Sequence, residues 1–146
     1  MMILKMAAEH VSQVAQLEKI CFSDPWSENS VASELKNKLS LWLVAVEDGS
    51  VAGYIGSQTV MDETDMMNVG VHPDFRRKGI AEALVTELVS QLQQQGSHCL
   101  TLEVRASNEP ARKLYDKLGF TQIGRRPNYY RNPKEDALIL RKEWAL

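Results

Sequence analysis

Near the middle of the chain a strand pattern changes to a helix pattern within ten residues, so that a helix begins just beyond a strand end. Val69 and Val71 alternate as at the end of a strand, and Pro73 cannot continue a ladder because it has no N–H donor. From Gly79 onwards the apolar residues recur every four positions, at Ile80, Leu84, Leu88 and Leu92. This spacing predicts an amphipathic helix of about four turns, and hence a fold that combines strands with helices.

The start of this helix has the composition of an anion-binding site. The first turn of a helix leaves backbone N–H groups without helical acceptors, and the helix dipole adds about half a positive charge there. Gly79 has no Cβ, so a phosphate can lie close to the backbone, and the basic residues Arg76, Arg77 and Lys78 precede it. The pattern alone also fits an ordinary solvated helix start.

The glycine spacing excludes the two best-known phosphate loops. A P-loop ends in Gly-Lys-Ser/Thr, whereas Lys78 precedes its glycine, and a dinucleotide-binding fingerprint needs three spaced glycines after the first strand. The segment Arg76-x-x-Gly79-x-Ala81 instead resembles the acetyl-CoA pyrophosphate loop, Gln/Arg-x-x-Gly-x-Gly/Ala, of the GNAT superfamily of N-acetyltransferases. This resemblance implies acetyl-CoA as the co-substrate. It also implies a set of cofactor-binding residues: Asn68, Val69, Val71, Arg76, Arg77, Lys78, Gly79, Ile80, Ala81 and Asn108.

The size of the chain fits one domain, which the resemblance implies is an N-acetyltransferase domain over residues 1–146. Apolar residues make up 44% and charged residues 25%, an ordinary balance for a soluble protein. No window approaches a membrane span and no secretory signal begins the chain, so we expect a cytoplasmic protein without a membrane partner. The net charge of −2 gives no sign of direct nucleic-acid binding.

Cys21 and Cys99 lie in apolar contexts, which indicates buried free thiols rather than a disulfide. Their spacing and the three scattered histidines give no metal-binding pattern, so we expect no metal site. His98 is adjacent to Cys99, but adjacent residues of a strand point to opposite faces of a sheet. This argues against a Cys-His dyad and favours direct transfer over an acetyl-cysteine intermediate.

The order of predicted elements is strand, two helices, three strands, helix, strand, helix, two strands. Strands are expected at residues 1–6, 41–46, 51–60, 64–71, 98–104, 120–124 and 137–140, with helices at 8–20, after Ser27, between Gly79 and Gly96, and from Ser107 or Asn108 to Gly119. A polar loop is expected between the last two strands. Hairpins and crossover helices together predict an α/β fold with a mixed, mainly antiparallel central sheet of about seven strands and about four flanking helices. This order resembles the GNAT-like acyl-CoA N-acyltransferase fold along the whole chain.

Two residues near the predicted cofactor loop suit the proton transfers of acyl transfer. The reaction needs a neutral amine, a polarised carbonyl and a proton for the leaving thiolate. Glu103 lies where a strand leads into a helix, and Tyr115 lies two turns into that helix. The residues alone leave other interpretations open: a strand glutamate paired with Arg105 or another neighbour, and a tyrosine that is part of the core.

The segment Leu102-Glu-Val-Arg-Ala-Ser-Asn108, together with Tyr115 and Leu118-Gly-Phe120, resembles the RimI-type branch of the superfamily, the ribosomal-protein-alanine N-acetyltransferases. The resemblance implies that Glu103 is the general base and Tyr115 the general acid, with Asn108 near the pantetheine arm or orienting Tyr115. It places the acceptor between residues 22–29 and 125–134. Three aromatic residues there either line a peptide groove or pack on the core: Trp26, Tyr129 and Tyr130.

The sequence therefore favours acetyl transfer from acetyl-CoA to the N-terminal α-amine of a protein, with the N-terminal alanine of a small-subunit ribosomal protein as the implied acceptor. Two alternatives remain open at this point. The enzyme would act on a lysine, a polyamine or a small-molecule amine in the first, and the chain would be a non-catalytic CoA-binding module in the second. The acidic turn at residues 61–65 either attracts a basic protein terminus or is simply solvated.

Overall fold

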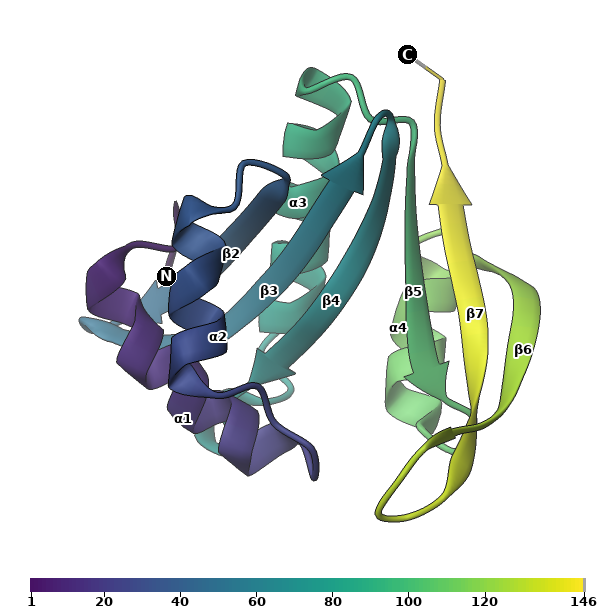
Figure 1. Ribbon diagram of the computed structural model, residues 1–146, viewed down its shortest axis with the longest axis horizontal. Coiled ribbons are helices and arrows are strands. Elements are labelled where there is room, and N and C mark those ends of the chain that lie inside the picture. Colours follow the sequence, from purple (N-terminus) through teal and green to yellow (C-terminus); the bar gives the residue numbers. More distant parts are fainter. Residues whose placement is uncertain (146) are drawn as a thin grey trace.

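The computed structural model describes residues 1–145 and has a central sheet with helices on both faces (Figure 1). The strands are β1 (Met2–Lys5), β2 (Ser40–Glu47), β3 (Ser50–Val60), β4 (Glu63–Val71), β5 (Cys99–Arg105), β6 (Thr121–Tyr130) and β7 (Glu135–Glu143). The α-helices are α1 (Val11–Cys21), α2 (Glu28–Ser33), α3 (Ile80–Gln94) and α4 (Glu109–Lys117), and 3-10 turns lie at Ala8–His10, Glu34–Lys36 and Pro73–Phe75. This confirms the predicted fold class and the predicted order of elements.

The sheet has the strand order β1-β2-β3-β4-β5-β7-β6, and only β4 and β5 pair in parallel. Their ladder contains three residue pairs, from Glu63 with Cys99 to Asp65 with Thr101. Beyond this point the two strands continue without pairing to each other, and Figure 1 shows them diverging. We call the unpaired stretches, residues 66–71 of β4 and 102–105 of β5, the seam. Backbone groups along its two edges are not used by a neighbouring strand of the described chain.

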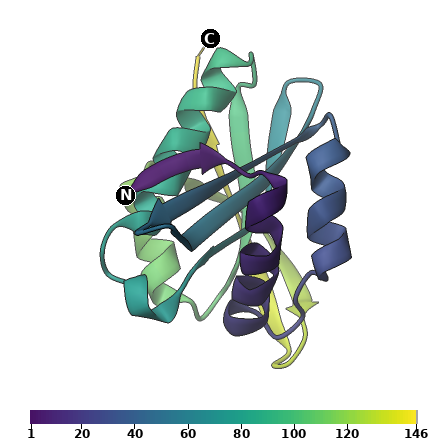
Figure 2. The same cartoon turned by 90° about the vertical axis from the view of Figure 1, so that its left-hand side faces the viewer.

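Helices cover the two faces of the sheet in pairs, α1 and α2 on one side and α3 and α4 on the other (Figure 2). On the α3 side, Leu84, Leu88 and Leu92 are fully buried, as their four-residue spacing predicts. Burying one such side chain contributes about 1.5–3 kcal/mol, so this single stripe fixes α3 against the sheet. On the other side, Val14 and Val31 pack with residues of β2 and β3 in a second apolar cluster.

Local capping signals set the helix ends that border the site. Ser27 caps α2 by accepting a hydrogen bond from the backbone N–H of Ser30 at 3.1 Å. Of the two candidates before α4, the structure selects Asn108, whose Oδ1 accepts from the N–H of Ala111 at 3.2 Å. Gly119 follows α4 with φ of +90°, a conformation that glycine adopts without a steric penalty.

Two details of the sequence prediction are wrong. Ile20 ends the helix predicted at residues 8–20, and its spacing of three from Leu17 predicts burial, but Ile20 is exposed and Glu18 is buried instead. The polar loop expected between the last two strands is mostly strand, because β6 continues to Tyr130 and only residues 131–134 connect it to β7. β6 is an edge strand with almost every side chain exposed, so it lacks the apolar alternation by which strands are detected.

No helix among residues 1–145 has both the length and the apolar character needed to cross a bilayer.

Candidate active site

The predicted phosphate loop is a concave turn that ends at the first residue of α3. Gly79 is the N-cap of α3 with φ of +76°, and Arg77 is also left-handed with φ of +65°. Turns of this kind direct successive backbone N–H groups to one side, where they form an anion-binding concavity. A Cβ built on Gly79 would meet no atom within 4 Å, so the space in front of its backbone is open.

Basic side chains flank this loop. The Nε of Arg76 donates to the backbone carbonyl of Val71 at 3.1 Å, and this bond ties the loop to the end of β4. The Nζ of Lys78 lies 5.3 Å from the centre of the Phe75 ring. The structure therefore brings the predicted loop residues together at one end of the seam, beside a helix N-terminus with its partial positive charge.

A β-bulge interrupts β4 at the seam. Gly56 of β3 is opposite Asn68 and Ser57 is opposite Met66, so Met67 is the additional residue of β4. The Nδ2 of Asn68 donates to the carboxylate of Glu18, at 3.1 and 2.9 Å from its two oxygens. The side-chain amide of Asn68 is therefore engaged within the protein, and a contact of Asn68 with the cofactor stays a prediction.

Glu103 lies on the open face of β5, within the seam. Its neighbours Leu102 and Val104 are buried on the α3 and α4 side, so Glu103 points to the opposite face. The Nε of Arg126 lies 3.5 Å from its carboxylate. Burial raises the pKa of Glu103, the Arg126 charge opposes this rise and Asp65 adds to it. A carboxylate with a raised pKa is a better proton acceptor than one in water.

Tyr115 projects from α4 to the other face of the seam. Its side chain is 4% exposed, and its ring meets Phe120 edge-on at 5.3 Å between centroids. The hydroxyl donates to the Sδ of Met66 at 3.8 Å. Met66 is the first residue of β4 beyond the section paired with β5. Burial raises the pKa of Tyr115, so the hydroxyl keeps its proton at neutral pH. Glu103 and Tyr115 therefore lie on opposite faces of the sheet at the same opening.

Asn108, by contrast, acts on α4 itself. Its side chain caps the helix, and so it fixes the first turn of the element that carries Tyr115. The side chains of Asn108 and Tyr115 form no hydrogen bond with each other in the described residues 1–145, since they bond to Ala111 and Met66.

The two segments expected to hold the acceptor are neighbours. The guanidinium of Arg131 pairs with Asp24 at 2.7 Å, and this contact joins the α1–α2 connection to the β6–β7 turn. Tyr129 is half exposed, and its ring meets that of Tyr130 edge-on at 5.1 Å. Trp26 is partly buried against the second apolar cluster. Trp26 thus has one side on the core, while Tyr129 remains available on the surface.

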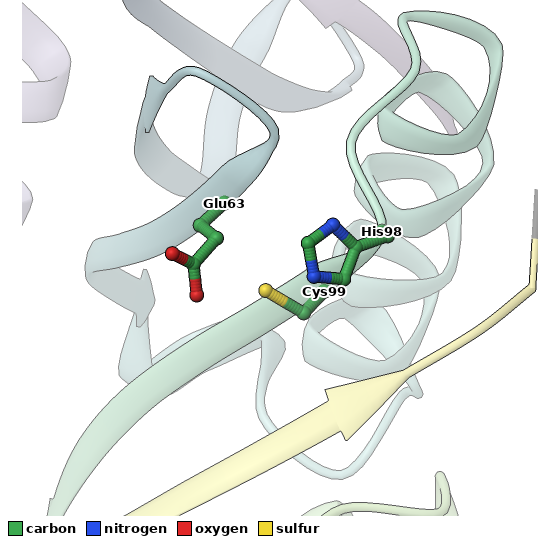
Figure 3. A group of neighbouring side chains, drawn as sticks. All are labelled: Glu63, His98 and Cys99. Atoms are coloured by element: carbon green, nitrogen blue, oxygen red, sulfur yellow. The ribbon is translucent and has the colours of Figure 1, made fainter.

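A group of possible metal ligands lies at the opposite, paired end of β4 and β5. Donor atoms of Glu63, His98 and Cys99 lie within 4.8 Å of one another (Figure 3). His98 comes before the first residue of β5, so strand alternation does not separate it from Cys99. The expectation that His98 and Cys99 point to opposite faces of the sheet is therefore wrong.

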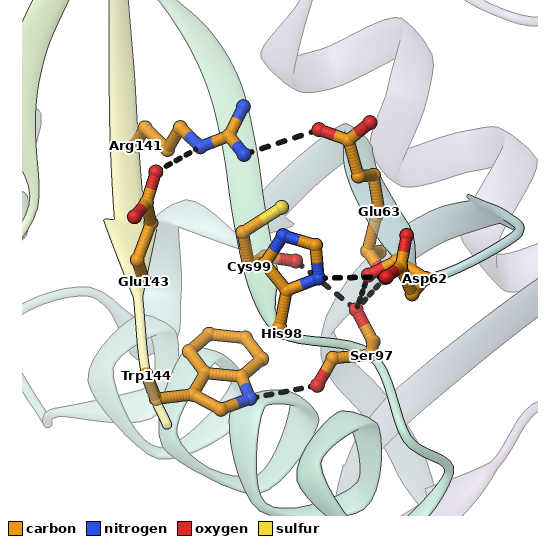
Figure 4. Close-up of polar contacts among 9 residues, drawn as sticks. Asp62, Glu63, Ser97, His98, Cys99, Arg141, Glu143 and Trp144 are labelled. Atoms are coloured by element: carbon orange, nitrogen blue, oxygen red, sulfur yellow. Dashed lines mark hydrogen bonds and ion pairs between the residues drawn. The ribbon is translucent and has the colours of Figure 1, made fainter. Parts of the chain in front are cut away.

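These donors already have partners (Figure 4). Arg141 contacts the Glu63 carboxylate at 3.1 Å, and the Nδ1 of His98 lies 3.2 Å from Asp62. Burial raises the pKa of Cys99, which disfavours the thiolate that a metal requires. We therefore assign no metal to this group, and the absence of a metal centre stays a prediction.

A sheet opened between two parallel strands, with a helix start and basic residues at one end and a glutamate and a tyrosine on opposite faces of the opening, fits an acyltransferase that uses a phosphate-bearing cofactor. The comparisons with known proteins agree with this class. The chain belongs to the acetyltransferase (GNAT) family, whose model matches residues 11–120. Members of this family transfer acetyl groups from acetyl-CoA, and the protein is an acetyltransferase of this kind.

Individual relatives match over almost the full chain. The [ribosomal protein bS18]-alanine N-acetyltransferase of Escherichia coli K12 is 38% identical over 136 residues, which cover 92% of this chain and 87% of the relative. The crystal structure of the E. coli ribosomal-protein-S18-alanine N-acetyltransferase superposes with a TM-score of 0.91 at 33% identity, covering 99% of this chain and 94% of that one. A chain of the NatC complex bound to Gag peptide and CoA shares the fold, with a TM-score of 0.82 at 22% identity, covering 99% and 100%.

Glu18, which borders the site through its hydrogen bonds to Trp26 and Asn68, is not predicted from the sequence. Its one signal is its position four residues after Val14, on the face of α1 that is otherwise apolar.

Proposed function

We propose that this protein transfers the acetyl group of acetyl-CoA to the N-terminal α-amine of a protein, and that its acceptor is the N-terminal alanine of a small-subunit ribosomal protein. The observation that carries the chemistry is the placement of Glu103 and Tyr115 on opposite faces of the seam. A thioester lying in the seam is then open to an amine from the Glu103 side, while its sulfur leaves toward Tyr115.

The proton transfers balance in this arrangement. The amine nitrogen attacks the thioester carbonyl and forms the C–N bond, and Glu103 accepts the amine proton, directly or through water. The tetrahedral intermediate then collapses, the C–S bond breaks, and Tyr115 gives its proton to the departing thiolate. Solvent then takes the proton from Glu103 and returns one to Tyr115, which restores both groups. Backbone N–H groups at residues 68–71 would polarise the carbonyl, and those at 77–81 would hold the pyrophosphate.

An α-amine suits a single glutamate base better than a lysine does. At pH 7 the neutral form of an α-amine, with a pKa of ~7.7–8.0, costs about 1 kcal/mol, against roughly 4.6 kcal/mol for lysine at ~10.4. The raised pKa of Glu103 makes it a stronger base, which favours proton transfer from an α-ammonium group. The proposed acceptor site lies between the Asp24 and Arg131 segments, with Trp26, Tyr129 and Tyr130 as contacts.

The alanine acceptor comes from the relatives, since the E. coli protein that is 38% identical is a ribosomal protein bS18-alanine N-acetyltransferase. We further propose that residues 1–146 act as one N-acetyltransferase domain. Strands from both ends of the described chain, β1 and β7, belong to the same sheet, which supports this. A cytoplasmic location and the absence of nucleic-acid and membrane partners stay predictions.

Mass spectrometry tests the function. A peptide beginning with Ala-Arg is incubated with the protein and acetyl-CoA, and the matched control has a blocked α-amine and a free internal lysine. Acetylation of the free N-terminus alone is the expected result. Acetylation of the lysine would instead favour the side-chain amine alternative. Binding of acetyl-CoA without any transfer would contradict the peptide acceptor and return the question to a small amine or a non-catalytic module.

A further inference from the structure

Glu18 is a fully buried carboxylate that takes no part in the chemistry described above, yet it contacts three elements around the site. One oxygen accepts a hydrogen bond from the backbone N–H of Trp26 at 2.9 Å and another from the Nδ2 of Asn68 at 3.1 Å. The second oxygen accepts from Asn68 at 2.9 Å and from the hydroxyl of Tyr54. Glu18 therefore links α1 to the acceptor segment, to β3 and to the bulge of β4.

All of these partners are neutral donors. Within residues 1–145 no lysine, arginine or histidine nitrogen lies within 4 Å of the Glu18 carboxylate, since every ion pair of the described chain involves other acids. A buried carboxylate without a cation must be held by hydrogen bonds. These bonds fix the orientation of the carboxylate, because each lone pair needs a donor in its own direction. Packing alone does not require such a group, because an apolar side chain of similar volume fills a core more favourably.

Three aromatic rings complete a closed ring of contacts that begins and ends at Glu18. The ring of Trp26 meets Trp42 edge-on at 5.3 Å, and Trp42 stacks on Tyr54 at 6.1 Å with an interplanar angle of 6°. Tyr54 then returns to Glu18, which holds the backbone of Trp26. A Cβ on Gly70 would lie 2.8 Å from the Tyr54 ring, so the glycine in β4 leaves the space through which Tyr54 reaches the carboxylate. The acceptor segment is thus fixed by both its backbone and its ring.

The other end of the network is the β4 bulge. Asn68 directly follows the additional residue Met67, and a bulge leaves backbone groups outside the ladder. Two hydrogen bonds from one side-chain amide to Glu18 fix this irregular backbone in a single position. The same backbone borders the seam in which the thioester would lie.

We propose that Glu18 is a positioning residue for acyl transfer, which holds the acceptor segment at Trp26 and the β4 bulge at Asn68 in one fixed relation so that the amine meets the thioester. This inference rests on the proposed function. The phosphate loop at Gly79 has no contact with Glu18 in the described structure, so cofactor affinity and transfer should respond differently to a change at Glu18. A displacement of about 1 Å at a reacting centre lowers rates by about 100-fold.

The first variant is Glu18→Gln, which keeps the shape and turns one oxygen into an NH₂ group that opposes the NH₂ group of Asn68. The expected result is a kcat/KM for the Ala-Arg peptide that is lower by about 10- to 100-fold, because the acceptor segment and the β4 bulge would shift relative to each other. Acetyl-CoA Kd, measured by calorimetry, should stay within about threefold, because the phosphate loop is intact and the backbone at residues 68–71 is proposed to meet only the acetyl carbonyl. Glu9→Gln is the matched control, since Glu9 is an exposed acid just before α1, and it should match the wild type.

A double variant restores the donor–acceptor match with the polarity reversed. In Glu18→Gln with Asn68→Asp, the glutamine NH₂ group donates to the new carboxylate while its oxygen still accepts from Trp26. The double variant should recover much of the kcat/KM lost in the single one. If it has the wild-type Tm but is as slow as the single variant, the positioning role is wrong.

A purely structural role would give a different result. Glu18→Gln would then lower Tm, while kcat/KM at a temperature well below Tm would equal that of the wild type, and the proposal would be overturned. If Glu18→Gln does not fold, Tyr54→Phe takes its place, because it removes one donor and keeps the ring stack on Trp42. A wild-type protein that acetylates no peptide would contradict the proposed function itself, whereas an active wild type leaves the decision to the Glu18 variants.

Discussion

Tyr115→Phe separates catalysis from stability, because the structure predicts opposite effects on the two. The Tyr115 hydroxyl is buried, and it donates to the thioether of Met66, a weak acceptor. A buried hydroxyl without a strong partner costs about 1–3 kcal/mol, of which the Met66 contact recovers part. Removing the hydroxyl should therefore raise the free energy of unfolding by about 1 kcal/mol, or about 3 °C in Tm for a domain of this size.

Turnover should change in the other direction. A positioned general acid contributes about 10²–10⁴-fold to a rate, so kcat of Tyr115→Phe should fall by at least about 100-fold. The raised pKa of Tyr115 means that the wild-type hydroxyl is available as a donor throughout the neutral range, and phenylalanine supplies no substitute. Acetyl-CoA affinity should change little, because the hydroxyl contacts β4 and not the Gly79 loop.

The assay combines differential scanning calorimetry with steady-state kinetics and titration of acetyl-CoA. Tyr54→Phe is the control for stability, because its hydroxyl donates to the buried Glu18 carboxylate. Losing a hydrogen bond to a charged group costs about 2 kcal/mol, so this variant should melt about 6 °C lower. Turnover of Tyr115→Phe within about threefold of the wild type would show that Tyr115 is only a core residue.

Three further predictions concern the base, the cofactor loop and the helix that carries the acid. Glu103→Gln should reduce kcat/KM most near pH 6, where the α-amine is protonated, and least near pH 9, given an amine pKa of about 8. If the pH profiles of kcat/KM for the variant and the wild type run parallel, Glu103 is not the base. Gly79→Trp should abolish acetyl-CoA binding by filling the loop, and its φ of +76° adds strain of about 1 kcal/mol; unaltered binding by calorimetry would mean that the pyrophosphate lies elsewhere. Asn108→Ala should lower Tm by about 3 °C, because it removes an N-cap worth about 1 kcal/mol, and an unchanged Tm would contradict the capping role.

Much of the fold could be predicted because its signals are local. The four-residue spacing in α3, the helix start after Ser27 and the hairpin of the strands at 41–46 and 51–60 each depend on a few neighbouring residues, and the structure confirms all three. β6 could not be predicted to its full length, because edge strands receive their register from one neighbour and need no apolar face.

In the candidate site, the helix start that follows Arg76 could be predicted because its motif lies on contiguous residues, while the binding of a cofactor there stays a prediction. Contacts between distant residues could not be predicted. Glu18, Tyr54 and Asn68 come from three elements, and the residue types alone do not show that one carboxylate joins them. The pairing of Glu103 with Arg126 is a similar case, since the sequence suggested Arg105 as its nearest candidate partner. Arg105 instead pairs with Glu135 at 3.3 Å, and only the antiparallel contact of β5, β7 and β6 determines this choice.

The seam also has a thermodynamic consequence. The two halves of the sheet, β1–β4 and β5–β7–β6, are joined at β4 and β5 by three residue pairs. A ligand that bonds to both edges binds the folded chain and not the unfolded one, so at 100 times its Kd it adds about 2.7 kcal/mol to stability. Domains of this size have about 5–15 kcal/mol in total. Saturating acetyl-CoA should therefore raise the Tm of the protein and slow its proteolysis in vitro, because it closes the weakly paired junction of the sheet.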